Sequence, residues 1–162
     1  MDQSQAEQLT RELSGVFARR GMIIWAAVTF AQVLFALQDI QGAWSIPINA
    51  FVRPIILGLG VGAVLGTAVC ALVVQFDVRR SMDSNLGFVI TGGPLGAIQG
   101  LAIGSNLPSF LSPFIYPGLA FRPAEQRAIA GAVLGTLSCY LLAALCKRRV
   151  ERRALKYRSR GM

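Results

Sequence analysis

Histidine is absent from this 162-residue chain. The sequence therefore lacks the commonest metal ligand, the usual general base at neutral pH and the usual axial ligand of haem. It also has no GKS or GKT phosphate loop, and the glycine-rich stretch at 92–96 does not follow a βαβ pattern. These absences argue against an enzyme. We expect no catalytic residue, no metal site and no cofactor other than lipid.

The cysteines also lack the spacing of a zinc or redox site, because no CxxC pair occurs. Cys70, Cys139 and Cys146 all fall in apolar runs, where a thiol behaves as a small hydrophobic group. We expect these cysteines to pack inside the protein. Their positions leave a disulfide between Cys70 and Cys139 open.

Charge is scarce through the middle of the chain. Only 15% of the residues are charged, whereas soluble proteins have about a quarter, and 54% are hydrophobic. Of the 24 charged residues, 1–20 hold six and 147–162 hold nine, so the 126 residues between them hold only nine. This distribution predicts a membrane protein with polar ends.

Four apolar segments approach the roughly 20 residues that cross a hydrocarbon core of about 30 Å. They are 21–37, 55–76, 86–104 and 128–146. The first and third contain Gln32 and Gln99, which a membrane helix tolerates when the amide bonds to a neighbouring helix. The predicted fold is an all-α membrane protein in which 21–146 form four transmembrane helices arranged as two hairpins.

Residues 1–20 are predicted to form an amphipathic surface helix along the membrane. Ser4 and Glu7 match a capping box, and Leu9, Leu13 and Phe17 recur at helical spacing. At the other end, 147–162 form a basic tail that either extends the last span as a helix or lies on anionic lipid.

The basic residues next to the first and last spans are candidate lipid-headgroup ligands. Basic runs that flank a span usually contact lipid or set orientation, so we favour anionic phospholipid, such as cardiolipin, over nucleic acid. The candidates are Arg19, Arg20, Lys147, Arg148, Arg149, Arg152 and Arg153.

Four spans place both termini and the connection at 77–85 on the same side of the membrane. That side collects 13 basic residues, and the other side has three, Arg53, Arg122 and Arg127. In a membrane that obeys the positive-inside rule, both termini would face the cytoplasm or matrix.

Glycines at four-residue spacing mark two of the spans and recur in the last. Residues at i and i+4 share a helix face, so each series forms a groove without side chains where another helix can approach. We expect these glycines to mediate helix packing within or between subunits: Gly58, Gly62, Gly66, Gly92, Gly96, Gly100, Gly131 and Gly135.

The last span repeats part of the second. Residues 62–70 read GAVLGTAVC and residues 131–139 read GAVLGTLSC, with seven identities in nine positions. The repeat favours two related hairpins over chance similarity of two small-residue helices. Within the four predicted spans no residue is ionisable apart from the cysteines and Tyr140, which weighs against a pump or proton-coupled carrier.

The connection between the second and third spans carries a recognisable motif. Arg79 and Asp83, followed by a helix with Gly92, Gly93 and Gly96, resemble the signature of the inner-membrane translocase family, also called the preprotein and amino acid transporter family. Within that family, the stretches 60–70 and 83–86 and the glycines of the third span are most similar to the small accessory subunits of mitochondrial respiratory complex I. The similarity covers 55–146.

This resemblance implies a multi-pass protein of the mitochondrial inner membrane with both termini in the intermembrane space. It implies that Arg79 and Asp83 fix the hairpin or contact a partner, whereas from spacing alone they could form a surface ion pair. The expected function is a non-catalytic accessory subunit of complex I, with other subunits and anionic lipid as partners and no small-molecule substrate. The alternatives are a protein-translocase component and a small-solute transporter between the hairpins.

Overall fold

The protein was studied as a computed structural model, which describes residues 3–37, 48–79, 91–103 and 121–160. Three long helices are α1 (Gln3–Ala36), α3 (Asn49–Arg79) and α5 (Ala124–Arg160), and 91–103 form a further helical stretch. Nearly all described residues are helical, which confirms the predicted all-α class.

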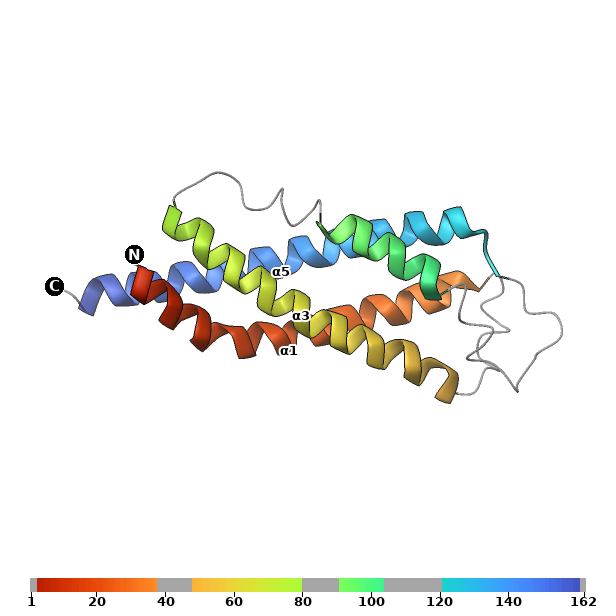
Figure 1. The fold of residues 1–162 in the computed structure, drawn as a ribbon, viewed down its shortest axis with the longest axis horizontal. Coiled ribbons are helices and arrows are strands. Elements are labelled where there is room, and N and C mark those ends of the chain that lie inside the picture. The colour runs from red at the N-terminus through yellow and green to blue at the C-terminus, as the bar shows by residue number, and fades with distance from the viewer. Residues whose placement is uncertain (1–2, 38–47, 80–90, 104–120, 161–162) are drawn as a thin grey trace.

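The helices form an elongated bundle in which successive elements run in opposite directions (Figure 1). α1 crosses α3, and the stretch 91–103 lies along the first half of α5. Because the order alternates, both chain termini lie at the same end of the molecule. We call this the terminal end.

Within the described part of the chain, three helices are long and apolar enough to cross a membrane: Ala6–Ala36, Phe51–Gln75 and Ala124–Arg153. The middle one has 25 residues, about 37 Å at 1.5 Å per residue, which exceeds a hydrocarbon core of about 30 Å. The chain is therefore a multi-pass membrane protein. The third predicted span, 86–104, is described only at 91–103, where it is helical.

The first predicted boundary, between a surface helix and a first span, has no counterpart in the backbone. A single helix, α1, covers both segments without a break. The apolar residues of its first half pack inside the protein: Leu9, Leu13 and Phe17 are fully or almost fully buried against α3 and α5. The sequence pattern is equally compatible with contact to lipid, and tertiary packing decides between the two.

The other helix boundaries also differ from the expected spans. α3 begins at Asn49, six residues before 55, and carries Pro54 within its second turn. α5 starts directly after Pro123, whose fixed φ suits the beginning of a helix, and continues to Arg160. The helix of the last span therefore extends through most of the basic tail, as one of the two sequence alternatives expected.

Buried side chains form two clusters, one toward each end. The cluster at the terminal end joins α1, α3 and α5 and includes Phe17, Trp25, Val74, Leu142 and Val150. The other joins the end of α1 to the stretch 91–103 through Val33, Leu37 and Ile103. There the backbone N–H of Arg122 donates to the carbonyl of Ala36 at 2.9 Å, which ties the start of α5 to the end of α1.

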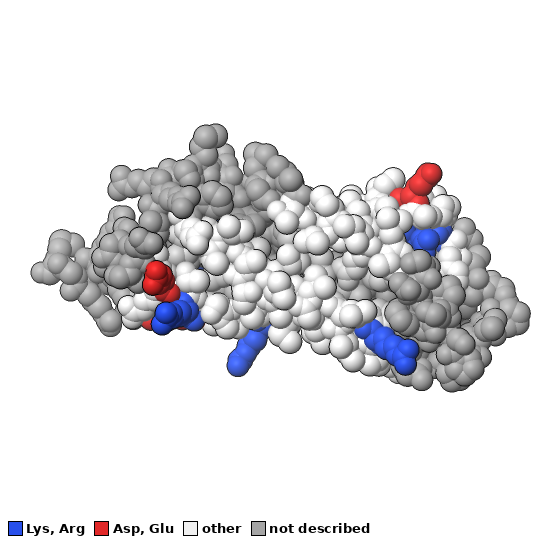
Figure 2. Space-filling model, in the orientation of Figure 1, with Lys and Arg blue, Asp and Glu red and all other residues white. Residues whose placement is uncertain are grey.

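The outward surface of the bundle is apolar. Ile56, Val64, Ile98 and Ile129 are each about 60 to 70% exposed, as expected for side chains that face lipid. On the face drawn in Figure 2, charged side chains lie on both sides of a middle zone whose surface is uncharged. A bilayer around that middle zone would cover the exposed apolar side chains.

Candidate functional site

The glycines of α3 form the contact with α1. A Cβ placed on Gly66 would collide with the backbone carbonyl of Phe17, and one on Gly62 would lie 2.7 Å from the Cβ of Trp25. On the facing helix, a Cβ on Gly21 would collide with the carbonyl of Gly62. The two backbones can touch only because these residues are glycines, which have no Cβ.

A second glycine contact joins 91–103 to α5. Gly96 and Gly131 face each other so closely that a Cβ on either would collide with the carbonyl of the other. Gly92 meets the backbone of Gly135 in the same way, and Gly100 meets Arg127 one turn farther along. All eight glycines singled out in the sequence therefore face a neighbouring helix.

The two copies of the internal repeat occupy equivalent places in these contacts. Gly62 and Gly66 in the first copy pack on α1, the preceding helix, while Gly131 and Gly135 in the second pack on 91–103. Each repeat thus supplies the glycine face of one antiparallel helix pair.

A polar cluster joins α1 to the stretch 91–103 inside the bundle. The Thr29 hydroxyl donates to the carbonyl of Trp25 at 2.8 Å and accepts from Gln99 Nε2 at 2.6 Å. Gln32 is 3% exposed, and its Nε2 donates to the carbonyl of Gly96 at 3.5 Å. This confirms that both glutamines bond to a neighbouring helix.

The Thr29 hydroxyl also determines how the Gln99 amide is turned. A hydroxyl has a single proton, and here that proton goes to Trp25. Toward Gln99 the oxygen can then only accept, so Gln99 must present its NH₂ group to it. The Gln99 Oε1 atom is left facing away and, among the described residues, has no hydrogen-bond partner.

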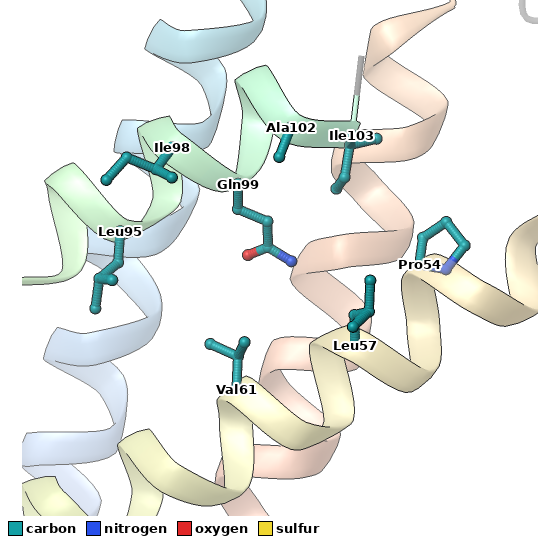
Figure 3. Close-up of a pocket in the computed structure, with 8 residues that line it drawn as sticks. All are labelled: Pro54, Leu57, Val61, Leu95, Ile98, Gln99, Ala102 and Ile103. Atoms are coloured by element: carbon teal, nitrogen blue, oxygen red, sulfur yellow. The ribbon is translucent and has the colours of Figure 1, made fainter. Parts of the chain in front are cut away.

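An apolar groove lies between α3 and 91–103, next to Gln99 (Figure 3). It has a volume of about 290 Å³. The lining residues are Pro54, Leu57, Val61, Leu95, Ile98, Gln99, Ala102 and Ile103. Because every lining side chain except Gln99 is apolar, the groove suits a hydrocarbon chain better than a polar solute.

Five arginines from two helices line a cleft at the terminal end, which we call the arginine cleft. It has a volume of about 540 Å³ and consists of Arg20 from α1 and, from α5, Leu145, Arg148, Arg149, Arg152 and Arg153. Arg153 lies 3.4 Å from the carboxylate of Glu12, and the Arg20 guanidinium lies 5.4 Å from the Phe17 ring centroid. This arrangement concentrates positive charge and donors that suit a phosphate group.

The cleft contains only part of the predicted headgroup set. Arg19 and Lys147 are exposed and do not line it.

The structure does not describe the motif between the second and third predicted spans. Asp83 lies outside the described residues, and Arg79 is the last residue of α3 with its side chain likewise outside them. All three cysteines are free and buried, so Cys70 and Cys139 are not bridged. The described residues contain no metal-binding group of His, Cys, Asp or Glu.

Sequence reasoning did not single out Gly21, Trp25 or Thr29, which complete the contact face of α1. A signal was available, because Gly21, Trp25, Thr29 and Gln32 follow one another at spacings of four, four and three and so share a helix face. A polar residue in an apolar span marks the inward face, and Gln32 could have identified the others.

Comparison with protein-family models, with curated proteins and with solved structures finds no match to this chain.

Proposed function

We propose that this protein is a non-catalytic structural subunit of a membrane complex, and that the complex is mitochondrial respiratory complex I. The observation that carries the structural role is the backbone-to-backbone packing of both helix pairs through their glycines. The choice of complex is supported by the resemblance of 55–146 to the accessory subunits of that assembly. In this proposal the two pairs are the two transmembrane hairpins, and the termini face the intermembrane space.

The glycine contacts support such a role because they leave the large side chains for the outside. Leu57 and Val64 on α3, and Val133 and Leu137 on α5, are all more than half exposed. Because the helices contact each other through their backbones, they hold these exposed side chains in fixed positions. Neighbouring subunits or lipid can then pack on them with little loss of backbone freedom.

The test is the mass and composition of the native assembly after extraction in mild detergent. We expect the chain to migrate with a large complex that contains the NADH dehydrogenase subunits, and the Gly96→Ala variant to be depleted from it. Gly15→Ala is the matched control, because a Cβ on Gly15 meets nothing within 4 Å. A stable free protein without partners would contradict the proposal.

The same preparation distinguishes the translocase alternative. If the chain instead migrates with import components, and its depletion blocks precursor import while complex I stays intact, the translocase function replaces the one proposed here. The arginine cleft and the lipid contacts expected there do not depend on which complex is found.

A further inference from the structure

We infer that the arginine cleft binds the headgroup of an anionic phospholipid that carries two phosphates. The inference starts from the arrangement of the charges. Arg148, Arg149 and Arg152 share one face of α5, and Arg20 joins them from α1, far away in the sequence. The basic tail alone accounts for the arginines along α5. The cleft forms because α1 packs on α5 and adds Arg20.

The cleft holds more positive charge than the described residues around it neutralise. Of its five arginines, Arg153 pairs with Glu12, and the described residues provide no ion pair for the four others, three of which lie on α5 and one on α1. Arginines that line one cleft repel one another, so a bound anion removes a repulsion as well as adding its own contacts. Arginine binds phosphate with two parallel N–H groups, and two arginines per phosphate leave room for two phosphates.

The wall of the cleft favours a lipid over a soluble anion. Leu141, Leu145 and Arg149 succeed one another on the same face of α5, so this face changes from apolar to basic along the helix axis. Leu141 is 48% exposed, and Leu145 packs on the buried cluster of the terminal end. A phospholipid would fit this face, with its acyl chains along the leucines and its phosphates at the arginines. The change from apolar to basic residues lies at the end of a membrane-spanning helix.

The experiment uses the full chain in neutral phosphatidylcholine nanodiscs, with lipid binding measured by native mass spectrometry and thermal unfolding by tryptophan fluorescence. Nanodiscs with added cardiolipin are compared with nanodiscs that carry phosphatidylglycerol at equal total charge. We expect cardiolipin to bind more tightly and to raise the unfolding temperature more. Pyrophosphate and inorganic phosphate, added to neutral nanodiscs, are the soluble arms and should have little effect.

The chain provides a matched pair of double variants. Arg20→Gln with Arg149→Gln removes two charges inside the cleft and should weaken cardiolipin binding about thirtyfold. Arg19→Gln with Lys147→Gln removes two neighbouring charges outside it and should leave binding within a few-fold of the parent. Both double variants change the net charge equally, so a diffuse electrostatic effect would weaken cardiolipin binding by the same amount in both.

Folding of the cleft variant is checked by its helical circular dichroism and by its unfolding temperature without anionic lipid, which should be unchanged or higher because repulsion is relieved. Arg20→Lys with Arg149→Lys, which keeps the charge, should retain part of the binding. Equal weakening by both Gln pairs, equal protection by pyrophosphate, or a cleft-dependent affinity for single-stranded RNA that exceeds that for cardiolipin would each overturn the inference. None of these results bears on which complex contains the protein.

Discussion

Gly96 illustrates how much of this bundle depends on a missing methyl group. A Cβ at this position would collide with the carbonyl of Gly131 and lie 2.9 Å from the Cα of Gly135. We expect Gly96→Ala to lower the free energy of unfolding in detergent by about 1 to 3 kcal/mol, the usual cost of overpacking. Gly60→Ala, where a Cβ meets nothing within 4 Å, should be neutral or stabilising by up to about 1 kcal/mol. Equal effects of the two variants would contradict the contact.

Thr29 accepts a hydrogen bond from Gln99 at 2.6 Å, which is shorter than the bond from Gln32 to Gly96 between the same two elements. Thr29→Val keeps the shape of the side chain but removes the acceptor of Gln99 Nε2. We expect a loss of about 1 to 2 kcal/mol in unfolding free energy, and partial recovery when Gln99→Leu is added, because the second change removes the stranded amide. Thr67→Val is the control, since among the described residues its hydroxyl bonds to the carbonyls of Ala63 and Val64 in its own helix. A larger loss in the control would exclude the interhelical bond.

At the scale of elements, α1 is the helix whose role differs most between sequence and structure. If its first half packs in the bundle, Phe17→Ala leaves a cavity between helices and costs about 3 to 5 kcal/mol. Ile23→Ala, at a site 70% exposed, should cost far less. Unfolding in detergent compares the two. If the first half of α1 instead lies on the membrane surface, Phe17→Ala will weaken membrane association without changing the stability of the remaining helices.

The helical extension of α5 also depends on its surroundings. Val150, an apolar residue within the basic tail, is buried in the cluster at the terminal end. The exposed faces of this segment carry the arginines, so one helix serves both the core and the arginine cleft. The sequence pattern alone left open whether this segment continues the helix into the bundle or lies on lipid. An apolar helix face can be buried against either the protein or the membrane.

At the scale of the whole molecule, the alternating helix directions predict that both termini lie on one side of the membrane (Figure 1). Epitope tags at the two ends should be accessible to protease together or protected together, first in intact organelles and then after rupture of the outer membrane. Accessibility of both tags after rupture would favour the intermembrane space. One tag accessible and the other protected would exclude the arrangement of spans.

The sequence alone determined that this is an all-helical membrane protein with polar ends and a basic C-terminal tail, because transfer of uncharged, apolar segments into a bilayer depends on composition and length. It also identified the glycine faces, since i and i+4 positions share one side of any helix. The tertiary structure decided which faces meet: Gly21 against Gly62, Gly96 against Gly131, and Gln99 against Thr29. It also decided that Arg20 joins the arginines of α5, while Arg19 and Lys147 do not. These pairings depend on the crossing of helices distant in sequence, which periodicity within one helix does not specify.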